Sequence, residues 1–254
     1  MSFDPFLPWI VSVALLTVRL TVAVALSPAL SAYGVPATVR IALTLALAAL
    51  AFAYRSPLSA AAEWAADPVR LVQPVLAEIF TGALLGLGVH VVLAAFALTG
   101  RLMDVQIGFG IGSIFDPITR TSANVLGSLV SLLGVTLFFV SEAHLALAQL
   151  VSDSIDVFPL GQLPALSDPM RPLLAAGSMY SLGLALAAPV VMALLLTDLV
   201  VGVASRNLPQ VNVLILAIPI KVMVGYVVLA LAVVGWAPLA RQGFGRMADI
   251  LGAR

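Results

Sequence analysis

Long runs of apolar side chains decide what this sequence can fold into. Five of the runs reach the roughly 20 residues that a helix needs to cross the hydrocarbon of a bilayer, and the second run is shorter. In apolar surroundings every backbone N–H and C=O group needs an internal partner, which an α-helix supplies within one segment. The sequence therefore predicts an all-α, membrane-associated protein with about six helical segments: Pro8–Tyr33, Val39–Tyr54, Pro74–Leu98, Val125–Leu150, Leu173–Gly202 and Val213–Trp236.

The composition agrees with this class and excludes several functions. Charged residues make up 9% of the 254 residues, whereas soluble domains carry about 25%. Twelve basic and twelve acidic residues leave no net charge and no basic patch, so nucleic acid is not an expected partner. The apolar composition makes membrane lipid an expected partner. The absence of cysteine excludes disulfides, thiolate nucleophiles and iron–sulfur clusters.

A glycine-rich, semi-polar stretch, Asp104–Pro117, interrupts the apolar pattern near the middle of the chain. Gly108, Gly110 and Gly112 alternate with bulky apolar residues, so the backbone can adopt conformations that are closed to other residues. The closing Asp-Pro dipeptide disfavours helical geometry. We expect a loop or broken helix between two apolar helices that acts as a mobile hydrophobic plug, because apolar constrictions seal by excluding water. A plain flexible connector is the alternative.

Several ionisable residues lie within or near the apolar segments, where a charge is costly and by default indicates a functional site. They are Arg19, Glu78, His90, Asp104, Glu142, Asp198 and Lys221. We favour pairing of these groups with one another or with neighbouring subunits over a role in proton transport. Proline in mid-segment, at 189 and 219, favours kinked helices that pack against partner subunits over straight lipid-exposed spans.

The sequence contains no arrangement of residues that is typical of an active site. His90 and His144 are its two histidines, and it has neither an H-E-x-x-H motif nor a serine nucleophile elbow. The glycine-rich stretch lacks a Walker lysine and the G-x-G-x-x-G spacing of a nucleotide-binding loop. We therefore predict no catalytic, cofactor-binding or metal-binding residues, and a protein that is not an enzyme.

Three motifs carry a resemblance to a known family. Residues 100–117 read Gly-Arg-Leu-Met-Asp-Val-Gln-Ile-Gly-Phe-Gly-Ile-Gly-Ser-Ile-Phe-Asp-Pro. Ser141-Glu-Ala-His144 precedes Phe158-Pro-Leu-Gly161, and Arg206-Asn-Leu-Pro-Gln-Val-Asn212 precedes Pro219 and Lys221. In this order the motifs resemble those of the flagellar biosynthetic protein FliR and its counterparts in virulence type III secretion systems, the SctT group. Ser141-Glu-Ala stands where that family has Asn-Gly before the histidine.

The resemblance implies a subunit of the flagellar protein export gate in the bacterial inner membrane, at the flagellar basal body. FliP-like, FliQ-like and FlhB-like subunits are the implied partners, and unfolded flagellar proteins are the implied cargo. The resemblance further implies one FliR-type domain of kinked helical hairpins over residues 1–254, FliP-like over about 1–172 and FliQ-like over about 173–254. It assigns the plug to Gln106, Ile107, Gly108, Phe109, Gly110, Ile111, Gly112, Ile114, Phe115, Asp116 and Pro117.

Two other functions stay open at the level of the sequence. The first is an SctT-type subunit of a virulence injectisome, which the same motifs fit. The second is a small secondary transporter that relays ions through Arg19, Glu78, Asp198 and Lys221. Transporters of that kind often contain paired broken helices in an internal repeat, and the sequence shows no convincing repeat.

Overall fold

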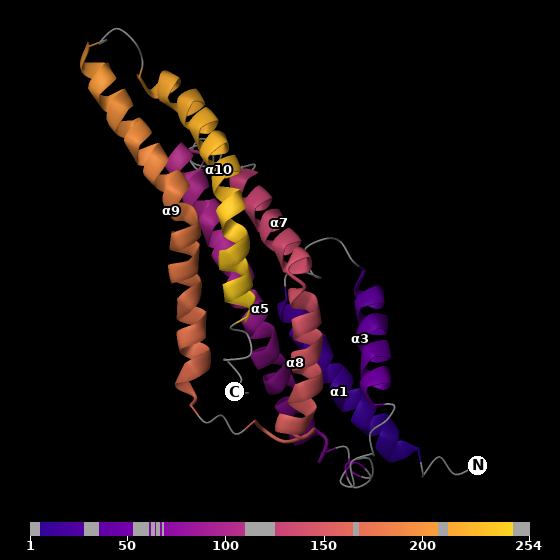
Figure 1. Cartoon of the computed structure of the whole chain (residues 1–254). Coiled ribbons are helices and arrows are strands. Elements are labelled where there is room, and N and C mark those ends of the chain that lie inside the picture. The colour runs from indigo at the N-terminus through magenta and orange to yellow at the C-terminus, as the bar shows by residue number, and fades with distance from the viewer. Residues whose placement is uncertain are drawn as a thin grey trace. The chain divides into compact units, whose positions relative to one another are not determined.

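The computed structural model describes residues 6–27, 36–52, 61, 64, 67, 69–109, 125–164, 168–207 and 213–245. Within these residues the regular structure is entirely helical, which confirms the predicted all-α class (Figure 1). The helices are α1 (Leu7–Leu26), α3 (Ala37–Phe52), α5 (Val72–Ile107), α7 (Val125–Val140), α8 (Ala143–Val157), α9 (Met170–Asn207) and α10 (Val213–Gly245).

Helix α5 is longer than the apolar run that predicts it, and this corrects the expected start of the glycine-rich loop. The helix has 36 residues and includes Asp104 and Gln106. It ends where Gly108 adopts a left-handed φ of 99°. The Gly108 N–H donates to the carbonyl of Val105 (3.2 Å) and the Phe109 N–H to that of Asp104 (3.0 Å), which is a Schellman ending. Gly108 therefore terminates the helix.

The fourth apolar run forms two helices where the sequence predicts one. Helix α7 ends at Val140 and α8 begins at Ala143, and Glu142 between them has a left-handed φ of 58°. Helix α8 also extends to Val157. It thereby enters the segment 151–172, for which the aspartates and prolines predict a loop. The physical reason is a buried stripe, Val151, Ser154 and Ile155, which leaves the aspartates on the exposed face.

Prolines in the interior of α9 and α10 do not end these two helices. Pro189 lies within α9, and Pro219 and Pro238 lie within α10. Each proline removes one helical hydrogen bond. Ending the helix would leave many more backbone groups without partners, which is costly in apolar surroundings. Continuous helix is therefore the less costly solution at all three positions.

By its packing the chain divides into two compact units. Unit 1 comprises Met1–Val91, Glu142–Ala176 and Phe244–Arg254, and unit 2 comprises Val92–Ser141 and Gly177–Gly243. Unit 1 thus holds α1, α3, α8 and the first half of α5. Unit 2 holds α7, the second half of α5 and most of α9 and α10.

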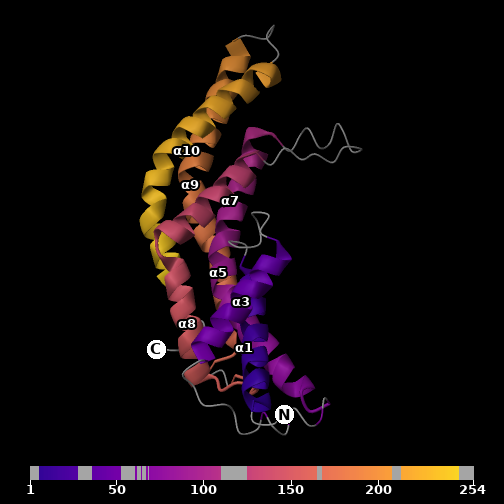
Figure 2. The same cartoon turned by 90° about the vertical axis from the view of Figure 1, so that its right-hand side faces the viewer.

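Unit 1 is built on close contact between helices. Helices α1 and α3 lie side by side (Figure 2). On α5, a Cβ added to Gly82 would stand 2.4 Å from the carbonyl oxygen of Arg19, and one on Gly86 would stand 2.9 Å from that of Ala23. Small residues four apart thus bring α5 against the backbone of α1. The surrounding core consists of Val13, Leu16, Leu20, Ala23, Ala48, Phe52, Leu84, Leu85, Val151, Ile155, Phe158 and Leu160.

Unit 2 is organised around residues 96–100 of α5. The ring of Phe96 meets Trp236 of α10 edge to face, with 5.8 Å between centroids. The hydroxyl of Thr99 lies 2.9 Å from two carbonyl oxygens, that of Ala95 in its own helix and that of Gly183 in α9, and shares its one proton between them. A Cβ on Gly100 would lie 2.6 Å from the Cα of Gly127, so α5 and α7 also touch through their backbones.

Four of the described helices, α1, α5, α9 and α10, are long and apolar enough to cross a membrane. Helices α7 and α8 make a fifth if they count as one broken span, and α3 is too short. The six apolar segments thus give four or five candidate spans. In α9 and α10 only 22% and 11% of the most apolar stretch is buried. Their outward surface is an apolar area of the kind that lipid or partner helices cover.

The close contact at Gly82 predicts that alanine destabilises the protein there but not at Gly202, a glycine with open space around it. Gly82→Ala should lower the melting temperature of the detergent-solubilised protein by several degrees, because overpacking costs about 1–3 kcal/mol. Gly202→Ala is the control, because Gly202 has no atom within 4 Å of an added Cβ. Alanine favours a helix over glycine by about 1 kcal/mol, so this variant should be as stable as the wild type or more so. Equal melting temperatures for the two variants would contradict the close contact.

Candidate functional site

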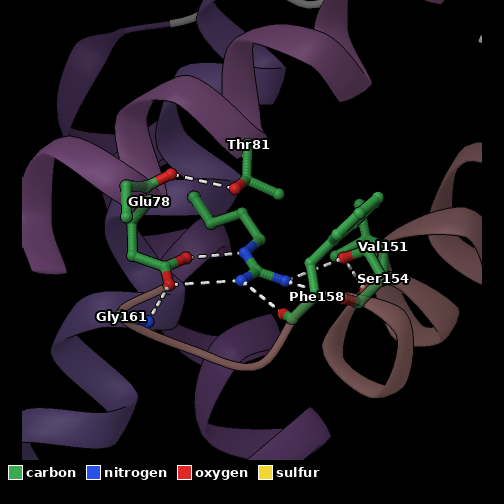
Figure 3. A network of polar contacts seen from close by, with 8 residues as sticks. Glu78, Thr81, Val151, Ser154, Phe158 and Gly161 are labelled. Carbon is green, nitrogen blue, oxygen red and sulfur yellow. Dashed lines mark hydrogen bonds and ion pairs between the residues drawn. The ribbon is translucent and has the colours of Figure 1, made fainter. Parts of the chain in front are cut away.

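A buried ion pair joins α1 to α5 within unit 1 (Figure 3). Arg19 Nε donates to Glu78 Oε2 at 2.6 Å, and Arg19 Nη2 donates to Glu78 Oε1 at 3.2 Å. Both side chains have no exposed surface. The planar guanidinium thus meets the carboxylate through two parallel bonds, the strongest form of this pair.

The rest of the guanidinium binds α8 and the turn that follows it. Arg19 Nη1 donates to the Oγ and the carbonyl oxygen of Ser154, both at 3.0 Å, and Nη2 donates to the carbonyl of Phe158 at 3.0 Å. The backbone N–H of Gly161 donates to Glu78 Oε1 at 2.6 Å. All five N–H donors of the guanidinium therefore have acceptors, which is what a desolvated charge requires.

The conformation of Gly161 allows the turn to reach the carboxylate. Its φ is 78°, a left-handed value that strains other residues, and a Cβ there would lie 2.5 Å from the ring of Trp64. Ser154 donates its own proton to the carbonyl of Val151 at 2.7 Å, so its oxygen is free to accept from Arg19. Three segments far apart in the sequence thus meet at one charge.

Asp104 joins α5 to the start of α7 within unit 2. Its Oδ1 accepts from the N–H of Leu126 at 3.0 Å and its Oδ2 from the N–H of Gly127 at 2.8 Å. The first turn of a helix has N–H groups without helical partners and a partial positive charge. The buried Asp104 carboxylate therefore caps α7 from a neighbouring helix.

A second polar cluster holds the last turn of α5 against α9 and α10. Lys221 Nζ pairs with Asp198 Oδ1 at 2.5 Å and donates to the carbonyl of Gln106 at 3.1 Å. Gln106 Nε2 donates to Asp198 Oδ2 at 3.2 Å. The lysine thus supplies a partner to a carbonyl that has none within the helix, at the negative end of the helix dipole.

Of the expected plug, the structure describes only the first four residues, 106–109. Gln106 and Ile107 are helical, Gly108 ends α5, and Phe109 follows it. Ile107 is buried, with 1% of its surface exposed. The remaining plug residues lie outside the described residues: Gly110, Ile111, Gly112, Ile114, Phe115, Asp116 and Pro117.

The other ionisable residues in the apolar segments take no part in these clusters. His90 is exposed, and its Nδ1 lies 3.1 Å from the carbonyl oxygen of Leu26. Glu142 is exposed at the start of α8 and makes no side-chain cap there. Among the described residues no group of three histidines or carboxylates is placed to hold a metal ion.

Sequence reasoning did not find the residues that complete the Arg19 and Glu78 pair. Ser154 lies 135 residues from Arg19 and beside an aspartate in a stretch that reads as a loop. Phe158 and Gly161 contribute backbone atoms, which carry no signature of residue type. The sequence does single out Phe158-Pro-Leu-Gly161 as a motif, and its proline and glycine indicate a turn, but nothing in it indicates that the turn binds Arg19 and Glu78.

Together the paired charges, backbone-to-backbone helix contacts and exposed apolar helices define the class: an all-helical membrane protein whose polar clusters connect helices. The family model for bacterial export proteins, family 1, matches residues 10–247. The chain belongs to this family. The resemblance to the FliR and SctT group is thereby confirmed.

Relatives of this family align with more than half of the chain. The flagellar biosynthetic protein FliR of Pectobacterium carotovorum is 29% identical over 178 residues, which is 70% of this chain and 68% of the relative. FliR of Bacillus subtilis is 29% identical over 60% of each chain. The secretion system apparatus protein SsaT of Salmonella typhimurium is 24% identical over 58% of each chain.

The buried ion pair predicts a large loss of stability when one partner is removed. Arg19→Met leaves the Glu78 carboxylate buried without its cation, a change that costs about 3–5 kcal/mol. We expect a marked fall in the melting temperature of the solubilised protein. Arg70→Met is the matched control, because Arg70 pairs with Asp67 at 3.4 Å on the surface, with 64% and 47% of the side chains exposed. An exposed pair contributes about 0–1 kcal/mol, so similar losses in the two variants would contradict the prediction.

Proposed function

We propose that this chain is a subunit of a type III protein export gate. In this proposal it joins FliP-like, FliQ-like and FlhB-like subunits in the bacterial inner membrane at the base of the flagellum. Unfolded flagellar proteins pass through the pore that the subunits form. The observation that carries the proposal is the family match over residues 10–247, with flagellar biosynthetic proteins among the relatives.

The outward surfaces of the helices support assembly with other subunits. Large apolar side chains are exposed along α3, α9 and α10, including Leu50, Leu199 and Val234. Such surfaces suit partner helices as well as lipid. In this proposal residues 1–172 are the FliP-like part and residues 173–254 the FliQ-like part, each packing against subunits of its own kind.

We also propose that the segment from Gln106 to Pro117 closes the gate. The described residues on either side support this role. The chain leaves α5 at Gly108, and α7, the next helix among the described residues, has its first turn bound to Asp104, only four residues earlier. Both ends of the intervening segment are thus fixed to the same turn of α5. A seal needs a fixed base, and the glycines beyond that base would supply its movement.

An injectisome is the second candidate function, and the similarity to the secretion system apparatus protein SsaT favours it. The ion-relay hypothesis has less support. A relay needs groups that exchange protons or ions, and every donor of Arg19 is occupied by an acceptor within the protein.

Deletion of the gene followed by plasmid complementation tests the proposed function. A flagellar gate subunit predicts loss of filaments and of swimming in soft agar, with both restored by the wild-type gene on a plasmid. Microscopy of filaments separates failed assembly from failed rotation. A deletion strain that still builds filaments would shift the assignment to an injectisome.

Replacement of the three plug glycines tests the movement of the segment. Gly108→Val, Gly110→Val and Gly112→Val together should reduce secretion of flagellar proteins into the medium, because valine cannot readily adopt the left-handed φ of residue 108 and stiffens the backbone. Gly177→Val and Gly202→Val, at helical glycines with open space around them, are the control. Normal secretion from the triple variant would refute the flexible plug.

Removal of the segment beyond its base tests the seal. A chain that lacks residues 109–115 keeps Asp104 and Gly108, and the resting gate should then leak small ions. Membrane potential, measured with a fluorescent dye, reports the leak against the wild type. An unchanged potential in cells that contain the assembled variant would count against the plug.

A further inference from the structure

The last turn of α5 sits in a two-part socket on α9 and α10. The polar part is Asp198 of α9 and Lys221 of α10, which bind the side chain and the carbonyl of Gln106. The apolar part lies one turn away on each helix, at Leu194 and Gly225. Residues four apart share a helix face, so the two parts form one surface, and all of it belongs to unit 2.

Gly225 gives this socket its shape. A Cβ added there would lie 2.9 Å from Cδ1 of Ile107 and 3.6 Å from its Cγ1, with Cδ2 of Leu194 at 3.7 Å. The Ile107 side chain therefore occupies the space that a larger residue at 225 would fill. Gly225 is itself buried, so α10 and the end of α5 meet there without intervening solvent.

The socket differs in kind from the Arg19 and Glu78 pair. The latter has no exposed side-chain surface, so neither charge can exchange its partner for water. The Asp198 side chain is 40% exposed and that of Lys221 15% exposed. A partly exposed ion pair is held much less firmly by the protein than a fully buried one. Of the two contacts, that of Gln106 and Ile107 with α9 and α10 is therefore the one that the protein can release at lower cost.

We propose that the socket of Leu194, Asp198, Lys221 and Gly225 holds the last turn of α5 in the resting gate and must release it for export. The inference rests on the proposed function, since it adds a latch to that gate. Asp104 keeps its bonds to α7 in this scheme, so the movement is confined to the residues after it. Displacement of α9 and α10 would then be coupled to the base of the segment that begins at Gly108.

A reversible cross-link tests the latch in assembled gates. The chain has no cysteine, so Ile107→Cys with Gly225→Cys introduces the only two thiols. A Cβ at residue 225 lies 3.6 Å from the Cγ1 of Ile107, so the two introduced side chains are direct neighbours. Cells that lack the native gene would produce this variant and be treated with a mild oxidant, and the intrachain bond would be detected by its mobility on non-reducing gels. Flagellar protein in the medium is the readout.

We expect export to be lost on oxidation and to return when a reductant cleaves the disulfide, which also shows that the variant is folded. The single variants Ile107→Cys and Gly225→Cys should each export the same amount with the oxidant as without it, because neither can form the intrachain bond. Continued export with the disulfide formed would overturn the latch, as would failure of the disulfide to form in resting gates. Neither result touches the proposed function, which fails separately if the wild-type gene does not restore export to the deletion strain.

Discussion

A charge placed among apolar helices has to find every hydrogen-bond partner within the protein, and this requirement shapes the whole structure. Arg19 meets it with acceptors from two helices and a turn. Asp104 meets it with backbone N–H groups that would otherwise lack partners themselves. In each case the requirement of one group is satisfied by a segment remote in sequence. The polar residues thus specify which helices are neighbours, while the apolar residues provide the bulk of the packing.

The helical type of the apolar runs follows from the sequence, because run length and backbone satisfaction leave one solution in apolar surroundings. The ends of the helices, and the division of the fourth run into α7 and α8, do not follow from it. Asp104 and Gln106 look like loop residues because no nearby residue supplies hydrogen-bond partners for their side chains. They are helical because α7 and Asp198 supply these partners. Similarly, α8 extends past its aspartates because Val151 and Ile155 are buried on the opposite face. Tertiary contacts decide both boundaries.

The charged residues of the clusters can be found from the sequence, but their pairing cannot. Arg19, Glu78, Asp104, Asp198 and Lys221 all stand out as ionisable groups in apolar stretches, and charge alone permits several pairings. Ser154 and the backbone of Gly161 settle the first pair, since they complete the coordination of Arg19 and Glu78. A serine and a peptide N–H are too common to mark a site. Such contacts become visible only when the chain is folded.

The order in which the ribosome delivers these partners sets a constraint on biogenesis. Glu78 follows Arg19 by 59 residues and Ser154 follows it by 135. At about 5–20 residues per second, Arg19 waits roughly 3–12 s for its carboxylate and roughly 7–27 s for α8. Until Glu78 is made, α1 carries an uncompensated cation, which opposes its entry into hydrocarbon. Until Ser154 and Phe158 are made, the guanidinium still lacks three of its acceptors. Helix α1 can therefore settle only after α8, and before that it needs water or an insertion factor around Arg19.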